Sequence, residues 1–139
     1  MRVTTSSVTV AASFVFATLL LSPMVSYAAG NATAGQHDFA LCARCHSSAP
    51  GVNMRGPSLA GIVGRKSGAA AGYKYSAAMA AANLTWDDAT LDKFLAGPRS
   101  FVPGTRMSVS VASGANRQDM IAYLNTLKEP RSKISFMES

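Results

Sequence analysis

The two cysteines of the chain lie three residues apart, at Cys42 and Cys45, and a histidine, His46, follows the second directly. Three kinds of chemistry use such a group: a redox-active dithiol, part of a metal site, or an attachment point for haem. On a helical turn, positions i, i+3 and i+4 share one face, so both sulfurs and the imidazole can meet one ring. The sulfurs can then form thioethers with the two haem vinyl groups, while the imidazole binds the iron.

The residues around this motif favour haem. A redox dithiol is expected after a strand in a βαβ unit, and no strand pattern precedes Cys42. A disulfide across so short a loop would constrain little of the chain. A four-ligand zinc site needs more cysteine or histidine than remains. The sequence therefore predicts one covalently bound haem c.

A second iron ligand must come from elsewhere in the chain. Met107 follows "VPGT" in a stretch without regular structure, and such a loop can wrap the far side of a ring. His37 precedes the motif on the same predicted helix and is expected on the surface. The other methionines after residue 29 fit a helix core, lie in the tail, or lie too near His46 to cross the ring: Met54, Met79, Met120 and Met137. Met107 is therefore the best-placed candidate.

Residues 1–29 have the pattern of a secretory signal peptide. Arg2 is followed by an apolar stretch from Val8 to Leu21, and small residues before Ala29 suit a cleavage site. The stretch is short for a membrane span, which needs about 20 residues; an uncleaved leader that anchors the protein is the alternative. We expect residues 30–130 to form one exported domain and residues 131–139 a C-terminal tail.

The charge and composition argue against nucleic-acid binding and for a small soluble domain. The net charge is +6, but the lysines and arginines are scattered, which disfavours nucleic-acid binding. We find no second apolar span, so the mature protein is expected to be soluble. After residue 29, large apolar residues are few, whereas alanine, glycine and serine are common. A chain this small and this poor in large apolar residues usually needs a stabilising group beyond its own core, and a covalently bound, bulky, apolar cofactor would serve as one.

The expected class is all-α, since no stretch alternates as a strand does. Helices are predicted over residues 33–45, 76–82, 85–95 and 116–128. Asn31 or Thr33 would cap the first helix, and Thr85 with Asp88 would form a capping box on the third. Glycines and prolines predict irregular loops over residues 47–72 and extended chain over residues 101–107.

Taken together, the haem motif and several further motifs resemble those of the soluble class I cytochromes c, in particular the mitochondrial-like cytochromes of bacterial periplasms. The resemblance covers nearly all of the predicted mature chain. It is carried by "CARCH" and by five further motifs: "GPSLAGIVGRKSG" (56–68), "GYKYS" (72–76), "FLAGP" (94–98), "VPGTRM" (102–107) and "IAYL" (121–124). It implies a small cytochrome c fold, with helices and loops wrapped around one haem.

The resemblance also implies roles for matching positions. Cys42 and Cys45 would be the thioether links, and His46 and Met107 the axial iron ligands. The carbonyl of Pro57 would accept a hydrogen bond from His46.

Other positions would hold the edge of the ring. Tyr75 and Trp86 would hydrogen-bond a buried haem propionate, and Arg65 would balance its charge. Tyr73 would line the same loop, and Thr105 would help to close the methionine loop.

Gly35 and Phe39 would meet the last helix near Met120 and Tyr123, where a missing side chain lets two helices approach closely. Two departures from the family pattern stand out. Met79 occupies a position where relatives often carry a polar residue, and the segment after Met107 lacks the usual lysines.

With both axial positions filled, the resemblance implies a periplasmic one-electron carrier and not an enzyme. It would shuttle between respiratory or dehydrogenase complexes as a monomer, meeting membrane complexes transiently and favouring partners with acidic docking surfaces. The alternative is a haem-based ligand sensor or haem enzyme in which Met107 is displaceable.

Overall fold

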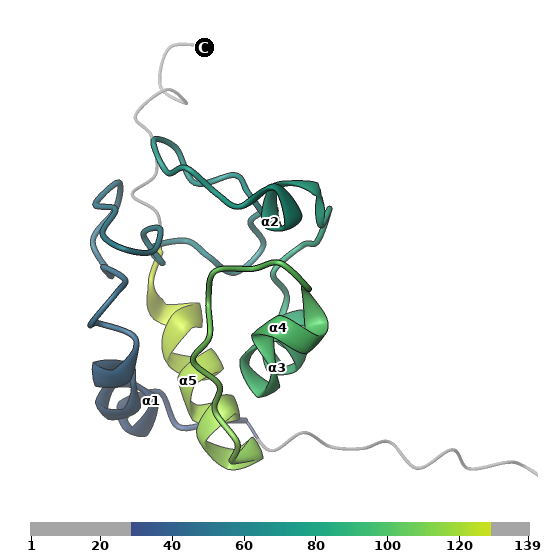
Figure 1. Ribbon diagram of the computed structural model, residues 1–139. Coiled ribbons are helices and arrows are strands. Elements are labelled where there is room, and N and C mark those ends of the chain that lie inside the picture. The colour runs from purple at the N-terminus through teal and green to yellow at the C-terminus, as the bar shows by residue number, and fades with distance from the viewer. Residues whose placement is uncertain (1–28, 129–139) are drawn as a thin grey trace, which may run out of the picture.

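The computed structural model describes residues 29–128, so residues 1–28 of the predicted leader and the predicted tail lie outside the described residues. Within this range the regular structure is helical, with long loops between the helices (Figure 1). Strand-like pairing in the range is limited to an isolated bridge between Lys66 and Thr85. The predicted all-α class is confirmed. None of the helices in residues 29–128 is long and apolar enough to cross a membrane.

The first helix is shorter than predicted. Helix α1 covers Ala32–Asp38, and the chain then tightens into a 3₁₀ turn at Phe39–Leu41. Asn31, one of the two predicted caps, accepts hydrogen bonds on its side-chain oxygen from two amide groups of the first turn, at 2.9 and 3.2 Å. The regular helix therefore ends before the cysteines.

The last helix supplies the most deeply buried part of the core. Helix α5 covers Gly114–Thr126, starting and ending two residues before the predicted bounds, and the Ser113 hydroxyl caps its start. Its buried side chains are Met120, Ile121 and Leu124, which are 1%, 2% and 4% exposed. They face the interior shared with the other helices.

Helices α1 and α5 cross in direct backbone contact (Figure 1). A side chain at Gly35 would overlap the backbone carbonyl of Asp119, so only glycine permits this approach. One turn further along, the rings of Phe39 and Tyr123 pack with their centroids 5.1 Å apart. The close approach of the first and last helices, expected from the resemblance, is present.

The third helix begins differently from the prediction. Helix α3 covers Asp88–Ala96, and Asp87 caps it by accepting a hydrogen bond from the Thr90 amide at 2.7 Å. The predicted capping box at Thr85 is wrong, because Thr85 is held away from the helix start by its bridge to Lys66.

Two short helices complete the fold. Helix α2 covers Ala77–Ala81 and is capped by Ser76, close to the predicted residues 76–82. Helix α4, a single turn at Pro98–Phe101, was not predicted. Pro98 ends α3 as expected, but its fixed φ also suits the first position of a new helical turn.

The glycine-rich residues 47–72 form loops without a helix, as predicted. Asn53 ties these loops together: its side-chain amide donates to the Ala71 carbonyl at 2.9 Å, and its oxygen accepts from the Ser58 amide at 3.0 Å. Side-chain bonds to backbone groups thus replace secondary structure in this region.

The contact at Gly35 gives a prediction about stability. Substitution Gly35→Ala should lower the free energy of unfolding of the haem-loaded protein by about 1–3 kcal/mol, because the added methyl meets backbone that cannot move aside. Guanidinium unfolding followed by circular dichroism measures this loss.

Gly97→Ala is the matched control. Gly97 has a φ of −166°, and a Cβ there would lie 3.7 Å from Ser100, an ordinary contact. This control should change the unfolding free energy by less than about 1 kcal/mol. Equal losses in the two variants would contradict the role given to the helix crossing.

Candidate functional site

A cavity of about 330 Å³ lies between the cysteine motif, helices α2, α3 and α5, and the loop that leads into α5. Helix α3 contributes Leu91, Phe94 and Leu95 to its wall, and α5 contributes Met120 and Leu124. Nine of the ten predicted site residues lie on this wall: Cys42, Cys45, His46, Pro57, Tyr73, Tyr75, Trp86, Thr105 and Met107. The sequence motifs therefore meet around one apolar space.

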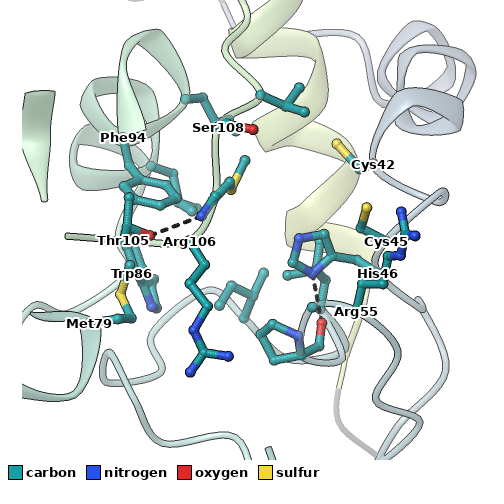
Figure 2. Close-up of a pocket in the computed structure, with 18 of the residues that line it drawn as sticks. Cys42, Cys45, His46, Arg55, Met79, Trp86, Phe94, Thr105, Arg106 and Ser108 are labelled. Atoms are coloured by element: carbon teal, nitrogen blue, oxygen red, sulfur yellow. Dashed lines mark hydrogen bonds between the residues drawn. The ribbon is translucent and has the colours of Figure 1, made fainter. Parts of the chain in front are cut away.

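The cysteine motif lies on a tight turn and not on the regular helix that was predicted. The backbone amides of Cys45 and His46 both donate to the Cys42 carbonyl at 2.9 Å. This turn still brings all three side chains to the same cavity, as Figure 2 shows for the two sulfurs and the imidazole. The spacing argument therefore holds even though the local conformation differs.

The two thiols are not joined in a disulfide. Cys42 is buried, and its thiol donates to the sulfur of Met120 at 3.5 Å. Burial, with a smaller contribution from the charge of Cys45, raises the pKa of the Cys42 thiol to about 11. Redox-active dithiols depend on a lowered thiol pKa, so this environment disfavours the dithiol interpretation.

The imidazole of His46 is oriented by a hydrogen bond. Its Nδ1 donates to the carbonyl oxygen of Pro57 at 2.8 Å, because a carbonyl can only accept. Burial lowers the pKa of His46, the bond to Pro57 opposes this, and the nearby positive charge of Arg65 lowers the pKa further. The ring is thus neutral near pH 7 and keeps its Nε2 lone pair for a metal.

Gly56 makes room for this ring. A Cβ at Gly56 would overlap the imidazole of His46. The glycine before Pro57 therefore lets the backbone pass directly behind the histidine. Sequence inspection assigned Gly56 only to a motif and gave it no role.

The methionine loop lies across the cavity from the histidine. Figure 2 shows Thr105, Arg106 and Ser108, the neighbours of Met107, on the side opposite His46. Met107 is half-buried on the cavity wall, and its amide donates to the Thr105 hydroxyl at 3.3 Å. This hydrogen bond lies within the loop at Thr105, the residue that the resemblance implies would help to close it.

Three aromatic residues line the remaining wall. The Tyr73 hydroxyl donates to the Arg55 carbonyl at 2.7 Å, while the Tyr75 hydroxyl accepts from the Ala70 amide at 3.2 Å. The two tyrosine rings pack edge to face, with their centroids 4.8 Å apart. Trp86 is buried and packs on Phe94 with a centroid separation of 5.0 Å.

Arginines complete the description of the site. Arg65 lies outside the cavity wall and donates to the carbonyls of Ser58 and Ala60, at 2.7 and 3.1 Å. Sequence reasoning missed Arg55 and Arg106, which do line the cavity. The sequence feature that could have indicated them is their position beside motif residues, since Arg106 directly precedes Met107 and Arg55 directly precedes Gly56.

Of the other candidate ligands, Met137 lies outside the described residues, and the rest take the positions predicted for them. His37 is exposed on α1, and Met54 is 50% exposed. Met79 and Met120 are buried and also contribute to the cavity wall. Among residues 29–128, no cluster of three or more His, Cys, Asp or Glu side chains could hold a metal ion by itself.

These features fit a haem better than the other two interpretations. Two thiols and a neutral, oriented imidazole lie at one side of an apolar cavity, which suits a planar iron porphyrin held by two thioethers. The hydrogen bond to Pro57 is the support expected around a ligating histidine, and the missing Cβ at Gly56 leaves room for its ring.

Comparison with known proteins agrees with this geometry. The family model for cytochrome c matches residues 32–128. Cytochrome c of Euglena viridis is 44% identical over 102 residues, which cover 72% of this chain and all of that protein. Cytochrome c2 of Rhodoblastus acidophilus is 43% identical over 107 residues, which cover 76% of this chain and all of that protein.

A solved structure shows the same fold. Cytochrome cH from Methylobacterium extorquens is 43% identical, with a TM-score of 0.66, and the match covers 70% of this chain and 99% of that one. The resemblance inferred from the motifs is therefore confirmed by sequence and by structure. The chain belongs to the cytochrome c family, and its cofactor is one covalently bound haem c.

Proposed function

We propose that the protein is a periplasmic one-electron carrier whose haem iron is held between His46 and Met107. The observation that carries this proposal is that Met107 and an oriented, neutral imidazole line one apolar cavity, with the labelled neighbours of Met107 on the side opposite His46 in Figure 2. When bound, the haem supplies an iron that takes up and releases one electron. Two protein ligands leave no iron position for a substrate, so the protein would act as a carrier and not as an enzyme.

The residues of the site would each hold the ring in a fixed place. Cys42 and Cys45 would tether it, and the hydrogen bond to Pro57 would keep the His46 ring aligned and raise its basicity. The apolar side chains that α3 and α5 contribute to the wall would help to exclude water from around the ring. A fixed, dry environment keeps the reorganisation between the two oxidation states small.

Polar groups on the loops would hold the propionates. The Tyr75 hydroxyl accepts from the Ala70 amide and can still donate its own proton into the cavity. Trp86 offers an indole N–H on the same wall. We also propose that Arg55 and Arg106, which line the cavity, balance the propionate charge together with Arg65.

The surface beside the cavity would meet the redox partner. Leu41 and Val109 lie on the cavity wall and are 42% and 39% exposed, so an apolar edge is open to a small, short-lived contact.

The distribution of charge supports partners with acidic docking surfaces. Between residues 39 and 86 the chain has five cations and no acidic residue. The acidic residues of the described range lie on or next to α1, α3 and α5: Asp38, Asp87, Asp88, Asp92 and Asp119. The loops around the cavity are thus the basic part of the molecule, which would steer acidic partners toward them.

The proposed location rests on the leader and on relatives. Residues 1–29 have a signal-peptide pattern, and the relatives include a bacterial cytochrome c2 and the cytochrome cH. We propose that the mature protein is a monomer that shuttles between respiratory or dehydrogenase complexes.

Carbon monoxide tests the ligand assignment. The reduced natural protein should not bind carbon monoxide readily at neutral pH, whereas Met107→Ala should bind it at least about tenfold more tightly, because no side chain competes for the iron. Absorption spectra measure binding. The oxidised natural protein should also show the weak near-infrared band of sulfur-ligated haem, and Met107→Ala should lose it.

Met54→Ala is the matched control, since Met54 is 50% exposed and is not itself among the residues that line the cavity. It should behave as the natural protein does in both measurements. Ready binding of carbon monoxide by the natural protein would instead favour a ligand sensor or haem enzyme with a displaceable Met107.

The contact at Gly56 gives a prediction about the reduction potential. In Gly56→Ala the methyl would overlap the His46 ring, which must turn and lose its bond to Pro57. The imidazole then donates less electron density, the ferric state is stabilised less, and the potential should rise. The unfolding free energy should also fall by about 1–3 kcal/mol.

Redox titration of the purified protein measures this potential. Gly97→Ala again serves as control, because its Cβ would meet only the Ser100 side chain at 3.7 Å. An unchanged or lower potential in Gly56→Ala would contradict the role given to the histidine hydrogen bond.

A further inference from the structure

The chain that follows Met107 has little structure of its own. Residues 107–113 form neither helix nor strand, and the side chains of Ser108, Val109 and Ser110 are exposed. Burial alone therefore does not fix the path of this segment. Specific bonds must hold it if Met107 is to stay at the cavity wall.

On the side that precedes Met107, two bonds are present. The Thr105 hydroxyl accepts from the Met107 amide at 3.3 Å, and the Arg106 guanidinium donates to the Lys74 carbonyl at 3.0 Å. These bonds fix the loop on its entry into the cavity but do not reach residues 108–113.

On the side that follows Met107, the bonds converge on Val111 and Ala112. The Val111 amide donates to the Leu95 carbonyl of α3 at 2.8 Å. The guanidinium of Arg117 donates through Nη1 to the carbonyls of Val111 and Ala112, at 2.9 and 2.8 Å. The segment is therefore held at one place from two helices, α3 and α5.

Arg117 is itself held in place. Its Nε donates to Oδ1 of Asp92 on α3 at 2.8 Å, and the two side chains are only 15% and 22% exposed. Gln118 also donates to the same oxygen at 3.2 Å. A planar guanidinium can bind the carboxylate and both carbonyls at once, which a lysine ammonium on a flexible stem does less well.

We propose that Arg117, held by Asp92, is a positioning residue that keeps Met107 at the haem iron by clamping residues 111 and 112. This inference rests on the proposed function, in which Met107 is the second ligand. Arg117 does not line the cavity, so it acts only through the path of the chain. Without the clamp, residues 108–112 gain freedom and the Met107-bound state is less populated.

An added ligand that competes with Met107 measures this population. Imidazole is titrated into the oxidised, haem-loaded protein while the near-infrared band of sulfur-ligated haem is followed. In Arg117→Gln the band should disappear at an imidazole concentration at least about tenfold lower than in the natural protein, because a weaker ligand-bound state is displaced more easily.

Arg117→Lys is the second variant, in case Arg117→Gln does not fold. It keeps the positive charge beside Asp92 but cannot form all three bonds together. Its imidazole affinity should also rise, by a smaller factor. The guanidinium unfolding curve of each variant is recorded alongside the titration.

Asn125→Ala is the matched control. The Asn125 amide donates to Asp88 at 2.9 Å, so it also joins α5 to α3 but does not touch residues 108–112. It should lower the unfolding free energy while leaving the imidazole affinity within about twofold of the natural protein.

The outcomes separate the two proposals. If the natural protein lacks the near-infrared band, Met107 is not the ligand and the proposed function fails. If the band is present but both Arg117 variants bind imidazole as the natural protein does, the clamp is overturned. Equal increases in the Arg117 variants and in Asn125→Ala would also overturn it, because any loosening of the helix pair would then suffice.

Discussion

The contact between the first and last helices is the constraint on which the rest of the site depends. Gly35 brings the backbone of α1 against that of α5 at Asp119, and Phe39 packs on Tyr123 one turn later. The chain then enters the cysteine turn while still in contact with α5, so that the sulfur of Cys42 reaches Met120. The position of the haem attachment group thus depends on helix packing by residues that do not line the cavity.

The second constraint is that the apolar residues of α3 and α5 face a cavity as well as one another. The remaining walls are loops with little secondary structure, held by side-chain bonds to backbone carbonyls, such as those of Asn53 and Arg65. Much of the apolar core of this small domain therefore borders the cavity, and a bulky apolar cofactor would complete its packing. Haem binding and folding are therefore coupled, because the same apolar side chains would pack against the ring and against one another.

Sequence reasoning identified the parts of the site that depend on local spacing. The cysteine–histidine motif carries its chemistry in five consecutive residues, and Met107, which lies on the cavity wall, became the candidate second ligand because a proline–glycine loop precedes it. Thr85 and Asp87 are both good capping residues, and only the distant bridge to Lys66 decides between them. Helix α4 is too short to show periodicity, and the directions of Arg55, Arg106 and Arg117 depend on contacts made by remote segments.

The order of the site residues along the chain has a consequence for biosynthesis. The group that forms the covalent links lies at residues 42–46, whereas Trp86, the apolar side chains of α3, the methionine loop and α5 all come later. A polypeptide made from its amino terminus therefore presents both thiols while most of the surrounding wall has yet to emerge. If the haem were tethered at that stage, the carboxyl-terminal half would close over a ring already in place.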